Sequence, residues 1–226
     1  MRICLIANYP ANSLVIALEN IITIDSGFMK KITLIFIDRE TETVTAISKK
    51  YNIKLIVANL NIKHTNRDFC ISLLDALKNE MIDYCLMFTK YIIKSEVLKE
   101  FKNKIINFHP SVLPACKGLN AIDQSIKQHS LLLGITAHFI DESIDGGYPI
   151  IQYILPSQFF REYKDVLNKT AVLMVQIIEW LSQNRIMVTE NGSVVNQADY
   201  RVSSFIPKLD AKLAIELHNR LKICEE

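Results

Sequence analysis

The sequence has few cysteines and no long apolar run, and each shortage excludes a class of protein. Its five cysteines are scattered and never form a C-x-x-C pair, so neither a disulfide framework nor a zinc site is indicated. The first apolar stretch, Ile3 to Ala7, is far too short for a signal peptide or a membrane span. We therefore expect a cytoplasmic protein that binds no metal and no membrane.

Charge of one sign is not in excess either. The chain carries 26 Lys and Arg against 24 Asp and Glu, a net charge of +2, and the two signs are interleaved. A nucleic-acid partner is therefore not indicated. Half of the 226 residues are hydrophobic, which is enough to fill a large core.

Apolar runs of strand length alternate with longer segments of helical period in the first half of the chain. The expected strands are Arg2–Ala7, Ile32–Ile37, Lys54–Ala58, Tyr84–Phe88 and Ile105–Phe108. The expected helices are Ser13–Ile22, Glu40–Tyr51, Arg67–Asn79 and Ser95–Phe101. This alternation predicts an α/β fold, a mostly parallel twisted sheet with helices on both faces and ligands at the carboxyl ends of its strands.

The second half departs from this alternation. We expect a short helix at Ala121–Lys127, strands at Leu133–Ile140 and Pro149–Leu155, one long helix over Glu162–Gln183, a hairpin turning at Asn191-Gly192, and a tail helix over Asp210–Ile223. No Ser-, Pro- or Gly-rich linker divides the chain. We therefore predict a single domain over 1–226, with a Rossmann-like acceptor half at 1–105, a catalytic and folate half at 106–183 and a C-terminal hairpin and helix at 184–226.

Two polar side chains stand at the end of the strand Ile105–Phe108. Alternate residues of a strand share a face, so Asn107 and His109 project together from its carboxyl end. An amide can stabilise a developing oxyanion while an imidazole moves a proton. Taken alone, the pair could also be an ordinary strand end with a turn histidine. Asp145, followed by Gly146 and Gly147, makes a catalytic set the stronger interpretation.

These segments together resemble the folate-dependent formyltransferase family, whose motifs are N-x-H-P-S-L-L-P, G-x-T-x-H and D-x-G-x-x-x-x-Q in this order. This chain reads Asn107-Phe108-His109-Pro110-Ser111-Val112-Leu113-Pro114, then Gly134-Ile135-Thr136-Ala137-His138, then Asp145-Gly146-Gly147 with Gln152 in register. The resemblance covers roughly Asp83 to Trp180. Within the family, the glycinamide ribonucleotide formyltransferases are the most similar, given Gly118-Leu119-Asn120-Ala121.

The resemblance implies that a primary amine of a small molecule attacks the formyl carbon of N10-formyltetrahydrofolate, the co-substrate, without a metal. Asn107 and His109 would hold the oxyanion, and Asp145 would orient and charge His109 and relay the proton. The pterin would lie between two loops and be bound largely by main chain. The implied folate-binding residues are Met87, Phe88, Tyr91, Ile93, Asp141, Glu142, Ser143 and Ile144. Tyr91 stands where the family often has an arginine.

The loop after the first strand departs from the resemblance. Glycinamide ribonucleotide formyltransferases cradle the substrate phosphate there with the amides of a Gly- and Ser-rich loop. Ala7 to Ser13 contains no glycine, and Pro10 has no amide hydrogen. We therefore favour the amine of a nucleotide-linked amino sugar as acceptor, with glycinamide ribonucleotide as the alternative. Tyr9, Asn12, Ser13 and Pro110 are the predicted acceptor-binding residues.

Other functions fit the sequence less well. A methionyl-tRNA formyltransferase would add a C-terminal barrel, and a formyltetrahydrofolate hydrolase an N-terminal regulatory domain. A dinucleotide-dependent oxidoreductase would need a G-x-G-x-x-G after the first strand, which this sequence lacks. A non-catalytic folate- or nucleotide-binding module on the same fold stays open, as does a homodimer.

Overall fold

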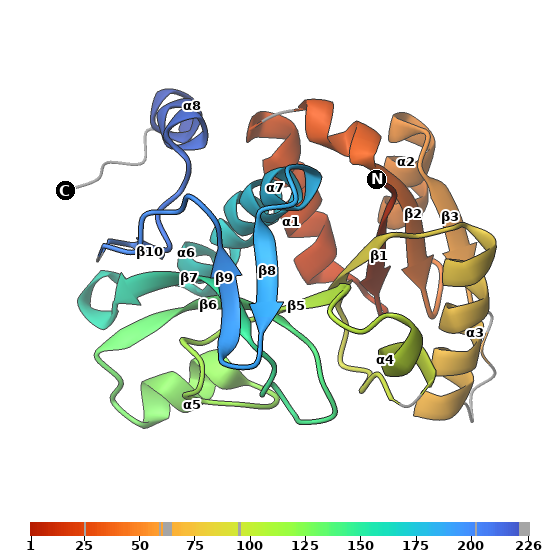
Figure 1. The fold of residues 1–226 in the computed structure, drawn as a ribbon, viewed down its shortest axis with the longest axis horizontal. Helices are drawn as coiled ribbons and strands as arrows, with labels where there is room; N and C mark the ends of the chain where they lie inside the picture. The colour runs from red at the N-terminus through yellow and green to blue at the C-terminus, as the bar shows by residue number, and fades with distance from the viewer. Residues whose placement is uncertain (25, 59, 61–64, 95, 202, 222–226) are drawn as a thin grey trace.

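The main sheet has its strands in the order β10-β7-β6-β5-β4-β1-β2-β3 (Figure 1). The computed structural model describes residues 1–24, 26–58, 60, 65–94, 96–201 and 203–221. The strands of this sheet are β1 (Ile3–Ala7), β2 (Ile32–Ile37), β3 (Lys54–Val57), β4 (Tyr84–Phe88), β5 (Ile105–His109), β6 (Leu132–Phe139), β7 (Pro149–Pro156) and β10 (Phe205–Ile206). A separate hairpin joins β8 (Ile186–Thr189) to β9 (Gly192–Val195).

Strands β1 to β5 pair in parallel, as the β-α alternation predicts, whereas β6, β7 and β10 are antiparallel additions at one side. All five parallel strands therefore end at the same edge of the sheet. The loops that follow β1, β4 and β5 meet there, and together with the acidic loop of residues 140–148 they carry most of the predicted site. The predicted fold class is confirmed.

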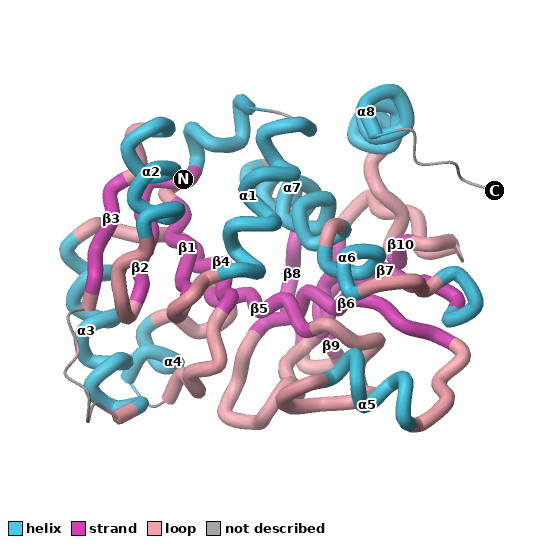
Figure 2. The backbone as a smooth tube through the Cα atoms, turned by 180° about the vertical axis from the view of Figure 1, so that it is seen from behind, coloured by secondary structure: helices cyan, strands magenta, loops and turns pink. Residues whose placement is uncertain are grey.

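Helices cover both faces of the sheet, and Figure 2 shows them from behind. They are α1 (Asn12–Ile24), α2 (Glu42–Tyr51), α3 (Asn66–Asn79), α4 (Glu96–Glu100), α5 (Ala121–Lys127), α6 (Tyr163–Leu167), α7 (Lys169–Ser182) and α8 (Ala211–Leu221), with short 3₁₀ turns η1 (Ser26–Lys31) and η2 (Ser157–Phe159). One core packs α1, α2 and α7 against the sheet, and a second packs α3 and α4 against the opposite face. Trp180, in the first core, is fully buried.

The sequence predictions hold for most elements but fail at two places. The single helix predicted over Glu162–Gln183 is wrong, because it is divided at Asn168 into α6 and α7. Asparagine is a poor helix former. The predicted Asn191-Gly192 turn is also wrong by one residue. Gly192 pairs with Thr189 in the ladder, which leaves Glu190 and Asn191 as the turn.

Strand β10 was not predicted; it pairs with the outer side of β7 through Phe205 and Ile206. The predicted helix start at Ser95, and the tail beyond Leu221, lie outside the described residues.

Candidate active site

Strand β5 presents Asn107 and His109 at the carboxyl edge of the sheet. Asn107 pairs with Met87 of β4 on one side and with His138 of β6 on the other, so the ladder fixes its backbone. His109 is only 4% exposed. Both residues line a cavity of about 620 Å³ in which the loops after β1, β4 and β5 meet the acidic loop of residues 140–148. The side chains of Asn107 and His109 therefore lie at one cavity, as the strand alternation predicts.

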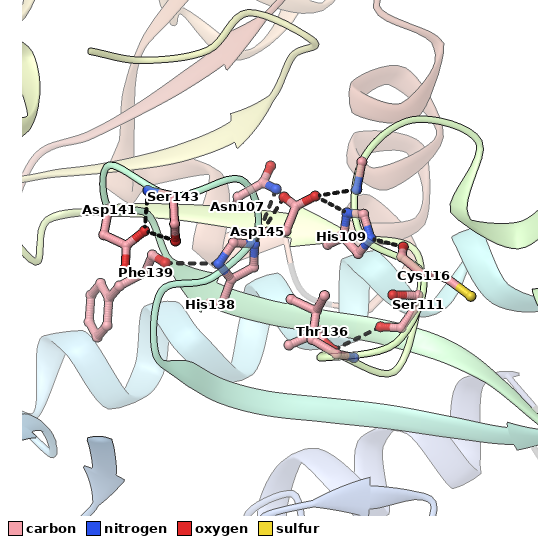
Figure 3. Close-up of polar contacts among 12 residues, drawn as sticks. Asn107, His109, Ser111, Cys116, Thr136, His138, Phe139, Asp141, Ser143 and Asp145 are labelled. Atoms are coloured by element: carbon pink, nitrogen blue, oxygen red, sulfur yellow. Dashed lines mark hydrogen bonds and ion pairs between the residues drawn. The ribbon is translucent and has the colours of Figure 1, made fainter. Parts of the chain in front are cut away.

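Asp145 reaches the same cavity from the acidic loop. Its carboxylate oxygen Oδ2 lies 3.2 Å from Nδ1 of His109 and accepts a hydrogen bond of 2.8 Å from the amide of Gly118 (Figure 3). The backbone of Asp145 is left-handed, with φ of 47°. Gly147 makes the loop geometry possible, because a Cβ there would lie 1.9 Å from the carbonyl oxygen of Phe139. Gly147 thus lets the acidic loop approach β6 closely, whereas a Cβ on Gly146 would meet Ser143 of the same loop.

The contacts of His109 determine where its protons lie. Its Nε2 is 2.8 Å from the carbonyl oxygen of Cys116, and a carbonyl only accepts, so Nε2 carries a hydrogen. Its Nδ1 faces the carboxylate of Asp145, which accepts as well when ionised. The contact is attractive only if a proton lies between Nδ1 and Oδ2. His109 and Asp145 therefore form one proton-holding unit.

His138 lies beneath this unit and contacts Asn107. Its Nδ1 donates to the carbonyl oxygen of Phe139 at 2.8 Å, and its Nε2 lies 3.3 Å from Nδ2 of Asn107 and 3.7 Å from Oδ1 of Asp145. Burial lowers the pKa of His138, although the Phe139 carbonyl and Asp145 oppose that change. The neutral ring accepts from the amide of Asn107. One N–H of that amide is thereby fixed, and the second is left for a ligand.

The other motif residues hold the loop that follows His109. Thr136 donates to the carbonyl oxygen of Ser111 at 2.8 Å and accepts from the amide of Leu113 at 2.9 Å. Gln152 donates to Thr136 at 2.8 Å and to the carbonyl oxygen of Leu113 at 2.9 Å. Thr136 and Gln152 therefore act on the loop rather than on a ligand. The sequence motifs contain both residues but gave no sign of this role.

Most of the predicted folate-binding residues line the cavity. They are Met87, Phe88, Tyr91, Ile93, Asp141, Ser143 and Ile144, whereas Glu142 lies outside the lining. Asp141 accepts from the amide and the hydroxyl of Ser143 and so shapes its own loop. Thr89, Lys90, Ile135 and Ile140 also line the cavity.

The predicted acceptor-binding residues divide into two pairs. Ser13 and Pro110 line the cavity, together with Asn8, Leu167 and Thr170. Tyr9 and Asn12 do not line it; Tyr9 is 47% exposed and lies under the guanidinium of Arg39, 4.9 Å from the ring centroid. Pro10 follows a cis peptide bond, and Ala11 has φ of 65°. The loop thus keeps a left-handed residue before α1 although it lacks glycine.

No group of three or more His, Cys, Asp or Glu residues within the described ranges could hold a metal ion. In those parts of the chain, no helix combines the length and apolarity needed to cross a bilayer.

Known proteins resemble this chain in sequence and in fold. A phosphoribosylglycinamide formyltransferase of Haemophilus influenzae is 31% identical over 104 residues, which cover 44% of this chain and 49% of the relative. The protein of the same name from Bacillus subtilis is 43% identical over 60 residues, 26% of this chain and 30% of the relative. The chain thus matches about half, or less, of the length of these curated relatives.

Solved structures share the architecture. Glycinamide ribonucleotide transformylase 1 of Symbiobacterium toebii superposes with a TM-score of 0.75 at 19% identity, over 86% of this chain and 93% of that one. A formyltetrahydrofolate deformylase of Pseudomonas syringae gives 0.67 at 17% identity, over 86% and 65%. At these identities the likeness concerns the fold. The profile of the family described as formyl transferase matches residues 24–177, more than half of the sequence, and the chain belongs to that family.

Proposed function

We propose that this protein is an N10-formyltetrahydrofolate-dependent N-formyltransferase and that its acceptor is the primary amine of glycinamide ribonucleotide. The observation that carries the proposal is the convergence of Asn107, His109 and Asp145 in one cavity, with Nδ1 of His109 3.2 Å from Oδ2 of Asp145. An amide donor next to a proton-holding pair suits acyl transfer to an amine.

The cavity suits a folate as formyl donor. Its volume of about 620 Å³ is within the usual range for a ligand of that size. The side chains of Met87 and Ile93 are buried and apolar, and residues 88–92 between them also line the cavity. A flat ring can insert between such side chains and use main-chain groups for recognition. This arrangement tolerates Tyr91 in place of an arginine.

The chemistry follows from the hydrogen bonds of the site. The free N–H of Asn107 would donate to the formyl oxygen as negative charge develops there. The proton unit of His109 and Asp145 would take up the amine proton and return a proton to N10 of the donor. Because Nε2 of His109 is bonded to the carbonyl of Cys116, that bond must open before this nitrogen can meet a substrate.

Glycinamide ribonucleotide is the acceptor that the relatives support best. Both curated relatives described above bear the name phosphoribosylglycinamide formyltransferase. The first turn of α1 begins at Asn12, and its leading amides have no carbonyl partner within the helix. They and the helix dipole offer some compensation for the glycines that the loop lacks.

A nucleotide-linked amino sugar is the second candidate, because the protein itself uses the amides of the loop. The amide of Tyr9 donates to Asp38 at 2.6 Å, the amide of Ala11 donates to the carbonyl oxygen of Asn8 at 2.8 Å, and Pro10 has none. A phosphate would lose two or three charge-assisted hydrogen bonds, each worth about 1.5–3 kcal/mol.

The acceptor is tested by direct comparison. With N10-formyltetrahydrofolate saturating, kcat/KM is measured for glycinamide ribonucleotide and for a nucleotide-linked 3- or 4-amino sugar. We expect about 10⁴ M⁻¹s⁻¹ or more for glycinamide ribonucleotide, as is typical of a native substrate. A much lower value, together with fast reaction of the amino sugar, would reverse the choice.

The division of the chain is part of the same proposal. Residues 1–105 would supply the acceptor half and residues 106–183 the catalytic half of one domain. Cavity residues such as Asn8 and Ser13 in the first half and Asn107 and Asp145 in the second support it. A homodimer stays a prediction that sedimentation of the purified chain would test.

A further inference from the structure

Asp38 lies between the loops that serve the two proposed substrates. It directly follows β2, which neighbours β1 in the sheet. Its Oδ1 accepts from the backbone amide of Tyr9 at 2.6 Å, and its Oδ2 accepts from the hydroxyl of Tyr91 at 3.0 Å. Tyr9 belongs to the loop before α1, and Tyr91 to the loop after β4. One carboxylate therefore bridges two loops that are far apart in the sequence.

Tyr91 is well placed to transmit an effect from the cavity. Its ring stacks on Phe69 of α3, with centroids 4.1 Å apart and an interplanar angle of 16°, and Phe69 is fully buried. Burial, followed by the nearby carboxylate of Asp38, raises the pKa of Tyr91 to about 12, so its hydroxyl stays a donor at neutral pH. Tyr91 also lines the cavity.

A second contact joins the same two loops. The amide of Lys90 donates to Oδ1 of Asn8 at 3.0 Å, and Nδ2 of Asn8 donates to the carbonyl oxygen of Tyr9 at 2.8 Å. Asn8 and Lys90 both line the cavity. A ligand that restrains the loop after β4 therefore restrains residues 8–11 through two sets of hydrogen bonds, one through Asp38 and one through Asn8. The set through Asp38 is made by side chains that can be replaced one at a time.

We propose that Asp38 is a positioning residue that couples the donor site to the acceptor site. The coupling rests on the proposed function, in which the folate contacts the loop that contains Tyr91. A folate that orders Tyr91 orders Asp38 and Tyr9 with it, so the acceptor meets a loop that is already fixed. By reciprocity, bound acceptor raises the affinity for the folate by the same factor.

Hydrogen exchange on the full-length protein tests this coupling without an acceptor. The probe is a stable 10-formyl folate analogue, whose binding is first measured by titration. In the unaltered protein, saturation with the analogue should slow exchange of the Tyr9 and Ala11 amides by about 5-fold or more. In Tyr91→Phe, which keeps the ring on Phe69, the slowing measured at a concentration of analogue that saturates the variant should fall clearly below that of the unaltered protein, because only the hydrogen bonds through Lys90 and Asn8 remain.

Further variants grade the effect. Asp38→Asn should retain part of the slowing, because its amide can accept from Tyr9 and donate to Tyr91, whereas Asp38→Ala should retain least. Tyr51→Phe, at the end of α2 and outside the cavity lining, should match the unaltered protein. Full slowing in Tyr91→Phe, or bound analogue with no slowing in the unaltered protein, would overturn the coupling alone. No binding of the analogue to the unaltered protein would instead overturn the proposed function on which it rests.

Discussion

Replacing His109 and Asp145 singly and together tests whether they act as one unit. Nδ1 of His109 lies 3.2 Å from Oδ2 of Asp145, and that oxygen has one further partner, the amide of Gly118. Without His109, the carboxylate of Asp145 has no imidazole with which to share a proton during the reaction. Without the carboxylate, the ring lacks the partner that holds its proton. The second substitution should therefore add little to the loss of activity that the first has caused.

The expected size follows from proton-transfer catalysis, which contributes about 10²- to 10⁴-fold. If His109→Ala and Asp145→Asn each lower kcat/KM by about 10³-fold, independent residues would lose about 10⁶-fold together, or ~8 kcal/mol. One unit would lose only about 10³-fold, or ~4 kcal/mol, so the coupling energy is about 4 kcal/mol.

The assay is steady-state release of tetrahydrofolate from the formyl donor, with urea unfolding of each variant as a control for folding. Asp145→Asn suits it because asparagine tolerates the left-handed backbone, φ of 47°, at this position. Losses that multiply in the double variant would refute the proton-holding unit, even if each single variant were nearly inactive.

Three further predictions concern single residues of the site. Asn107→Ala should lower kcat by about 10²- to 10³-fold, with the affinity for a folate analogue nearly unchanged, because one oxyanion donor is lost; an equal loss of affinity by titration would contradict that role. The pKa of His138 is lowered in the folded state from its ordinary 6.5, so the unfolded chain binds the extra proton. The free energy of unfolding should therefore fall as the pH drops from 6.5 towards the pKa of His138 in the folded protein. Urea unfolding at two pH values should show a smaller fall in His138→Gln than in His129→Asn, a control at an exposed residue. Equal falls in the two variants would exclude His138 as the cause. Gly147→Ala should destabilise the protein more than Gly118→Ala. The new Cβ meets the Phe139 carbonyl at 1.9 Å in the first, whereas in the second it meets nothing within 4 Å and only the left-handed backbone, φ of 83°, is strained; equal shifts in Tm would contradict the close approach.

The sequence predicted the parts of the structure that depend on local pattern. Apolar runs of strand length located β1 to β5 to within one residue, because strands covered on both faces, such as β1, are apolar throughout. Strand alternation predicted that Asn107 and His109 share a face, and the family motifs added Asp145; all three line one cavity, and their catalytic roles stay a prediction.

The sequence could not predict features that depend on the order of strands in the sheet. Asp38 and Tyr91 are 53 positions apart, and only the placement of β1 between β2 and β4 brings their loops together. The short strand β10 carries two residues and no pattern of its own. The engagement of the Tyr9 amide by Asp38 likewise depends on a partner distant in the chain.

Formyl transfer itself is measured most directly by following an isotope-labelled formyl group. The purified protein is incubated with labelled N10-formyltetrahydrofolate and glycinamide ribonucleotide, and the products are separated. The proposed function predicts label in an N-formyl product, formed only when protein and amine are both present. Label released as free formate at the same rate with and without the amine would show hydrolysis instead. A donor that binds but keeps all its label, with glycinamide ribonucleotide or an amino sugar present, would identify a non-catalytic binding module and contradict the proposal.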